Sequence, residues 1–84
     1  MILNRQEVLK QINDIFVEVL DNSSTKINEK STANDVDGWD SLTHIELVVA
    51  IEKHFKIRFS SEQIRSWKNV EEIIDSILSK SVRI

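Results

Sequence analysis

The sequence predicts an all-α protein, a four-helix bundle with three long helices and one short helix. Three observations support this prediction. Apolar residues recur at helical spacing along three separate stretches. The chain has no proline and only one glycine. No two segments show the alternation of paired strands. With 84 residues there is room for one domain, spanning residues 1–84, and for no deep substrate pocket.

The first long helix is expected from about residue 5 to residue 20. Asn4 stands before it and Glu7 follows three positions later, which is the pattern of a capping box. Apolar residues at steps of three and four define the side that faces the core: Val8, Ile12, Ile15, Phe16 and Val19.

A long loop is expected between the first and second helices, over residues 21–40. It is rich in Ser, Thr, Asn and Asp, which favour turns. Ile27, Ala33 and Val36 are available to anchor it to the core. Loops of this length in compact domains are commonly functional, and this one leads directly to Ser41.

The second long helix is expected from Ser41 to residue 54 or 55, with Asp40 as its N-cap. At about 100° per residue, the helix carries two apolar stripes on nearly opposite sides. One stripe is wide enough to face the core, and its members are Leu47, Val48, Ile51 and Phe55. The second is edged by carboxylates and is interpreted as a docking surface, formed by Leu42, Ile45, Val49, Glu46 and Glu52. Coverage of the second stripe by a neighbouring segment remains the alternative.

The short helix and its connector follow. Ile57 and Phe59 alternate with polar residues but have no partner strand, so an extended connector with two buried anchors is expected. Ser60 and Gln63 form a capping pattern for a short helix that ends near residue 65 or 66.

The last long helix is expected to begin after Asn69 and to end near Ser79. Asn69 and Glu72 again have capping-box spacing. Its apolar stripe consists of Val70, Ile73, Ile74, Ile77 and Leu78. Trp67, Val82 and Ile84 are interpreted as packing at the edge of the core.

Composition excludes several classes of function. Without cysteine and with two histidines, the chain lacks the residues for disulfides or a plausible metal site. The N-terminus becomes polar at once and no apolar run reaches membrane-spanning length, so a cytoplasmic protein without membrane contact is expected. The formal charge is −3, and no Lys or Arg lies between Lys30 and Lys53. The acidic region around Ser41 would repel nucleic acid and attract a basic protein surface.

Ser41 is the candidate functional residue. At the first turn of a helix, its hydroxyl would lie beside unpaired backbone N–H groups and the positive end of the helix dipole, where a phosphate ester is well tolerated. His44 follows three positions later, but no orienting acid and no glycine-rich oxyanion loop accompany the pair. No catalytic residue is therefore expected, and His44 is interpreted as a partly buried, hydrogen-bonded side chain.

Residues 39–59 resemble the serine-bearing helix of the acyl carrier protein family. The resemblance begins with Asp40-Ser41-Leu42 at the start of a helix, continues with Glu46-Leu47, and ends with the Ile-x-Phe anchor at residues 57–59. The order of helices and loop extends it over nearly the whole chain.

The resemblance implies that Ser41 carries covalent 4'-phosphopantetheine, transferred from coenzyme A by a phosphopantetheinyl transferase. The chain would then be a monomeric carrier of acyl thioesters rather than an enzyme, and a substrate of acyl-activating or acyl-transferring enzymes. Asp40 would contact the transferase. Four further residues match positions that partner enzymes touch: Leu42, Ile45, Glu46 and Val49.

Some features depart from this pattern. Fatty-acid carriers are usually far more acidic, and here the helix ends in Lys53, His54 and Lys56, which argues against housekeeping fatty-acid synthesis. A tryptophan directly before the aspartate, as at Trp39, is similar to carriers of polyketide, lipid-modification or surface-polysaccharide pathways. Packing of this side chain against the loop also explains it. The Gly-Gly-x-Ser pattern of peptidyl carriers is absent. A different hypothesis is an unmodified helical adaptor that binds proteins through the same surface.

Overall fold

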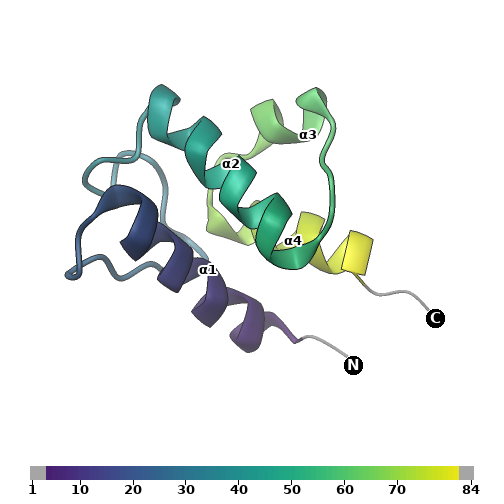
Figure 1. The fold of residues 1–84 in the computed structure, drawn as a ribbon, viewed down its shortest axis with the longest axis horizontal. Helices are drawn as coiled ribbons and strands as arrows, with labels where there is room; N and C mark the ends of the chain where they lie inside the picture. The colour runs from purple at the N-terminus through teal and green to yellow at the C-terminus, as the bar shows by residue number, and fades with distance from the viewer. Residues whose placement is uncertain (1–3, 82–84) are drawn as a thin grey trace.

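The computed structural model describes residues 4–81, and its fold is the predicted all-α bundle of three long helices and one short helix (Figure 1). No strand occurs among these residues. The prediction about Val82 and Ile84 concerns residues outside the described range. The helices are α1 (Arg5–Leu20), α2 (Ser41–Phe55), α3 (Ser61–Ser66) and α4 (Val70–Ser81). The last helix thus extends two residues beyond its predicted end.

The core lies where α1, α2 and α4 meet. Figure 1 shows α1 and α2 side by side and running in opposite directions, and α1 also contacts α4. The stripes that periodicity predicts supply most of the buried side chains, although Ile15, Val19, Phe55 and Leu78 are only half-buried. The helical part of the core consists of Val8, Ile12, Phe16, Leu47, Val48, Ile51, Val70, Ile73, Ile74 and Ile77.

The helix starts confirm the predicted caps but not every capping box. Asn4 Oδ1 accepts from the Glu7 N–H at 2.8 Å, and Asn69 Oδ1 accepts from the Glu72 N–H at 3.1 Å. At both starts the reciprocal bond, in which the N-cap N–H donates to the glutamate carboxylate, is missing among the described residues, so two of the predicted boxes are half-formed. The box at Ser60 is complete.

The long loop is fixed to the helices on both sides. Asn13 of α1 accepts from the Ile27 N–H at 2.8 Å and donates to the Thr25 carbonyl at 3.4 Å. On the other side, the N–H groups at the start of α4 donate to loop carbonyls, Val70 to Ser31 at 3.0 Å and Glu71 to Glu29 at 2.8 Å. Ile27 and Val36 are buried as expected, whereas Ala33 is exposed and anchors nothing.

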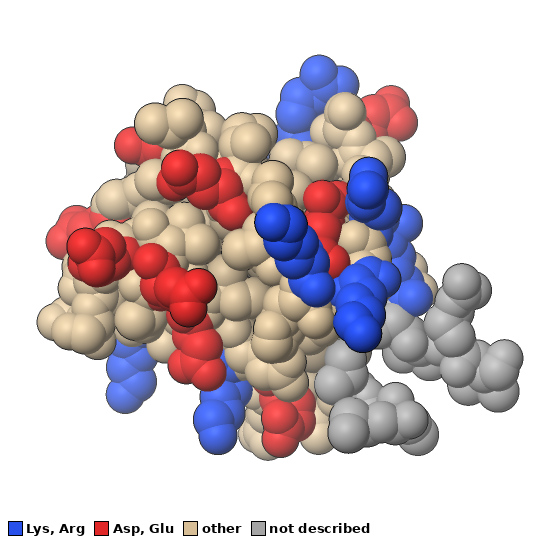
Figure 2. All heavy atoms as spheres, viewed as in Figure 1, with Lys and Arg blue, Asp and Glu red and all other residues tan. Residues whose placement is uncertain are grey.

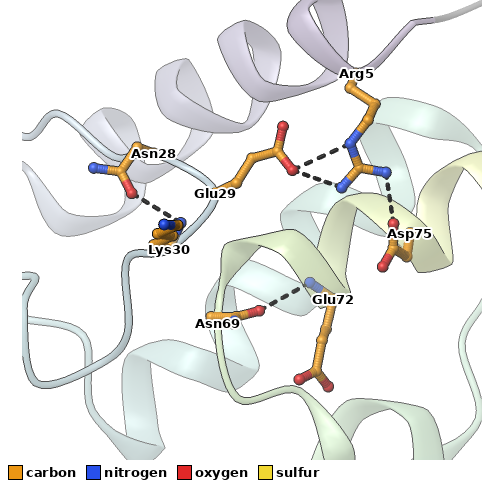
Figure 3. A network of polar contacts seen from close by, with 7 residues as sticks. All are labelled: Arg5, Asn28, Glu29, Lys30, Asn69, Glu72 and Asp75. Atoms are coloured by element: carbon orange, nitrogen blue, oxygen red, sulfur yellow. Dashed lines mark hydrogen bonds and ion pairs between the residues drawn. The ribbon is translucent and has the colours of Figure 1, made fainter.

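An ion-pair bridge joins α1, the loop and α4 (Figure 3). Arg5 donates to Glu29 Oε1 at 2.7 and 3.1 Å and to Asp75 Oδ1 at 2.6 Å. These bonds, the one to Glu29 first, raise the pKa of the Arg5 guanidinium above its already high ordinary value. Because the three side chains are partly exposed, water screens the bridge, and it orients the loop more than it stabilises the fold.

Replacing Asn13 should loosen the loop. Asn13→Ala leaves the half-buried Ile27 N–H without its acceptor, so we expect a loss of about 1–2 kcal/mol in the free energy of unfolding, measured by urea denaturation. Asn34→Ala is the control, because Asn34 is exposed and its side chain makes no hydrogen bond among residues 4–81. Equal stability of the two variants would contradict this account of the loop.

Candidate functional site

Ser41 is the first residue of α2 and its side chain is exposed. The predicted N-cap is confirmed, because the Asp40 backbone is extended and its Oδ1 accepts from the N–H groups of Leu42 at 3.0 Å and Thr43 at 2.9 Å. The serine hydroxyl is therefore presented to solvent at a helix start whose backbone is fixed.

Thr43 completes a capping box that the sequence analysis did not predict. Its hydroxyl oxygen accepts from the Asp40 N–H at 2.8 Å, and the hydroxyl lies 2.6 Å from the Gly38 carbonyl, to which it donates. Gly38 has a φ of +88°, a conformation that side-chain-bearing residues rarely adopt. The loop thus turns at its glycine and is tied at once to the first turn of α2.

One expectation about this helix start is wrong. The N–H groups of Leu42 and Thr43 are not unpaired, because the Asp40 carboxylate accepts both. The bonds from Thr43 and Leu42 hold the pKa of Asp40 below its ordinary value, so this carboxylate is charged at neutral pH. A negative charge added at Ser41 would consequently lie beside the charge of Asp40.

Trp39 and His44 connect the end of the loop to the bundle. The buried Trp39 packs edge-on against Phe16, with ring centroids 5.0 Å apart, and its Nε1 donates to His44 Nδ1 at 3.1 Å. Because indole nitrogen only donates, His44 accepts at Nδ1 and donates from Nε2 to the Ile64 carbonyl at 3.3 Å. Both ring nitrogens are therefore engaged away from Ser41. This confirms that His44 is partly buried and hydrogen-bonded.

A surface hollow of about 580 Å³ lies beside Ser41, between α2 and α3. Trp67 forms part of its lining and is held by a bond from its Nε1 to Ser76 Oγ at 2.9 Å and by an edge-on contact with Phe59. Arg65 and Lys68 add two positive charges to the lining. Nothing local in the sequence places α3 next to Ser41. The part that Trp67, Arg65 and Lys68 take in this hollow could therefore not be predicted.

The second apolar stripe of α2 is exposed, which excludes coverage by a neighbouring segment. Leu42, Ile45 and Val49 have exposed fractions of 71, 55 and 45%. Glu46 is also exposed. Glu52 differs, because it is half-buried and its Oε2 accepts from the Phe59 N–H at 2.9 Å. The structure thus leaves four of the five predicted docking residues exposed and gives Glu52 a structural bond.

Within residues 4–81, no three His, Cys, Asp or Glu side chains are grouped so that they could hold a metal ion. In the same range, no helix is both long and apolar enough to cross a bilayer.

Comparison with known families identifies the chain. Residues 10–77 match the family described as a phosphopantetheine attachment site. An acyl carrier protein of Acidothermus cellulolyticus is 32% identical over 83 residues, which are 98% of this chain and 98% of the relative. The chain belongs to the acyl carrier protein family. It is thus a carrier protein of the kind to which phosphopantetheine is attached.

Further relatives agree with this assignment. An acyl carrier protein of Buchnera aphidicola is 34% identical over 79 residues, covering 93% of this chain and 98% of the relative. A solution structure of the holo acyl carrier protein of Geobacter metallireducens has a TM-score of 0.80 and 38% identity, covering 86% of this chain and 83% of that one. The bundle described above is thus an acyl carrier protein fold.

The Asp40 cap should make the stability of this carrier depend on pH. Because the pKa of Asp40 is lower in the folded chain, its contribution is present above the unfolded pKa of about 3.9 and is lost as the pH falls through the folded value. Asp40→Ala should therefore melt at a lower temperature than the wild type at pH 7, and the gap should narrow below about pH 4.

The melting temperatures are measured by circular dichroism, and Asp37→Ala is the matched control. Asp37 is an exposed carboxylate of the same loop that caps no helix. Its removal should leave the melting temperature close to that of the wild type at both pH values. A gap for Asp40→Ala that does not change with pH would contradict the role assigned to its charge.

Proposed function

We propose that this acyl carrier protein carries 4'-phosphopantetheine, derived from coenzyme A, on Ser41. The single observation that carries the proposal is the exposed Ser41 hydroxyl at the start of α2, within the matched attachment-site family. The chain contains no cysteine, so the thiol for a thioester has to come from an attached group. When bound, the group supplies that thiol at the end of a flexible arm.

The residues around Ser41 suit a phosphodiester. The Oγ atom is accessible, and the positive end of the α2 dipole lies at the same residue. Arg65 and Lys68 bring two cations to the neighbouring hollow, which offset the charge of Asp40.

The proposed cargo is an acyl intermediate of fatty-acid, polyketide or specialised lipid biosynthesis. A phosphopantetheinyl transferase loads Ser41, with Asp40 at the contact, and acyl-activating or acyl-transferring enzymes dock on the exposed stripe of α2. Because the arm keeps the carried group close to a docked enzyme, weak and short-lived docking is sufficient. A monomer in the cytoplasm remains the expectation from the sequence.

Loading of Ser41 can be measured directly. Incubation of the chain with coenzyme A and a broad-specificity phosphopantetheinyl transferase should add one phosphopantetheine unit to the intact mass, and Ser41→Ala should abolish the gain. Ser61→Ala is the control, because Ser61 is an exposed serine at the first position of another helix, α3. A wild-type chain that gains no mass would favour the unmodified adaptor, whereas a Ser41→Ala chain that still gains mass would assign the attachment to another residue.

The exposed apolar stripe of α2 should affect the loading of Ser41 because the transferase binds to it. Ile45→Ala removes a large exposed side chain, so we expect kcat/KM of the transferase to fall about fivefold, mainly through KM. The thermal stability should stay unchanged because Ile45 is 55% exposed. Ser23→Ala in the long loop is the control. Unchanged kinetics for Ile45→Ala would remove Ile45 from the docking surface.

A further inference from the structure

The exposed side of α2 changes its charge along its length. Glu46 lies beside the apolar stripe in the first half of the helix, whereas Lys53 and Lys56 follow on the same side at its end. From a rise of about 1.5 Å per residue, Lys53 lies about 18 Å along the axis from Ser41. Figure 2 shows Lys and Arg side chains gathered over the end of α2 and the segment after it, with one acidic side chain among them, and more acidic side chains over the opposite part of the molecule.

The cations at this end form a defined basic cluster, consisting of Lys53, Lys56 and Arg58. All three are exposed, and together with Val49 and Ile57 they line a hollow of about 610 Å³. Within residues 4–81 the ion pairs are those of Arg5, so no described carboxylate lies within ion-pair distance of the basic cluster. Glu52 also lines the hollow but already accepts from the Phe59 N–H.

The helix dipole explains only part of the basic cluster. A cation in the last turn of a helix is favoured by the partial negative charge there, which accounts for Lys53. Lys56 is the C-cap of α2 and gains from the same effect, whereas Arg58 lies beyond the helix end and gains little. Three unpaired cations that continue an exposed apolar stripe are instead suited to contact with a negatively charged surface.

We propose that the enzymes that act on this carrier have a two-signed docking face, with positive charge at one end and negative charge at the other. On that face, a basic patch lies opposite Glu46, near Ser41, and a carboxylate patch lies opposite the basic cluster, about 11 Å further along the helix axis from Glu46 to Lys53. An apolar patch between them covers Ile45 and Val49. This proposal rests on the proposed carrier function, because that function is what requires partners to dock beside Ser41.

Charge complementarity favours a protein over an anionic polymer or membrane. The formal charge of the chain is −3, and Asp40 and Glu46 lie on or next to the same face, so a uniformly negative partner would be repelled at the Ser41 end. A uniformly basic partner would be repelled by the basic cluster. A two-signed face satisfies both ends, and it also fixes the direction in which a partner lies along α2, because the reversed direction opposes like charges.

The test uses the full chain labelled with ¹⁵N and three amphipathic helical peptides that share one apolar face. The first peptide has arginines at one end and glutamates at the other, the second has arginines at both ends, and the third has glutamates at both ends. Amide chemical-shift titration should show that the two-signed peptide binds about tenfold more tightly than either other peptide. The amide signals of both Glu46 and Lys53 should change their chemical shifts on binding. These changes should become smaller at about 0.5 M salt, because salt screens the charges.

Charge reversal should invert this preference. The double variant Lys53→Glu/Arg58→Glu should bind the all-arginine peptide best. The variant Lys53→Gln/Arg58→Gln removes the two cations without adding negative charge, so it introduces no new repulsion with the helix dipole. It should lose about half of the preference for the two-signed peptide, on a logarithmic scale of affinity. Lys26→Glu is the matched control, because it reverses an exposed cation in the long loop, far along the chain from α2, and should keep the wild-type preference. Circular dichroism checks that each variant is helical.

Several outcomes would overturn the proposal. These are equal binding of the two-signed and all-arginine peptides, the absence of any binding by the two-signed peptide, and an unchanged preference in the charge-reversal variant. Binding to phosphatidylglycerol vesicles that the charge-reversal variant loses would assign the basic cluster to a membrane instead. Phosphopantetheine loading of the same wild-type sample separates the two proposals: if loading fails while the peptide preference holds, the carrier function is wrong and the surface assignment stands.

Discussion

The start of α2 is the constraint on which the rest of the site depends. The Asp40 carboxylate takes the N–H groups of Leu42 and Thr43, and the Thr43 hydroxyl ties the turn back to Gly38. These bonds fix where the helix begins, and with it the rotation of every later residue about its axis. Ser41 is exposed, and the apolar residues of α2 divide between core and solvent, because of that one starting point.

The two sides of α2 then have separate tasks. Leu47, Val48 and Ile51 pack against α1 and α4 and stabilise the bundle by burial. Leu42, Ile45 and Val49 stay in contact with water, which is an unfavourable arrangement unless another surface covers them for part of the time. A helix whose core side is largely buried can keep such an exposed stripe without losing its fold, since the stripe contributes less to internal packing than the core side does.

Electrostatics around Ser41 are a balance of opposing charges. The helix dipole and the cations Arg65 and Lys68 favour an anion there, whereas the charged Asp40 opposes one and has already taken two backbone donors. The helix start therefore combines features that attract an anion with one that repels it. In the proposed function, this balance would leave an arm on Ser41 free to reach the active site of another protein.

The sequence by itself determined the elements of this protein. Helical periodicity, capping residues and the Asp40-Ser41-Leu42 triplet were enough to predict the four helices, the buried stripe of α2, its exposed opposite stripe and the family, because each signal lies within a few neighbouring residues. Only the tertiary structure decided what meets across the bundle. The bond from Arg5 to Asp75 joins residues 70 positions apart, Glu52 is drawn to the Phe59 backbone, and Trp67 is brought beside Ser41 to form the hollow. Such contacts depend on how packed helices cross, and no local pattern of residues encodes that crossing.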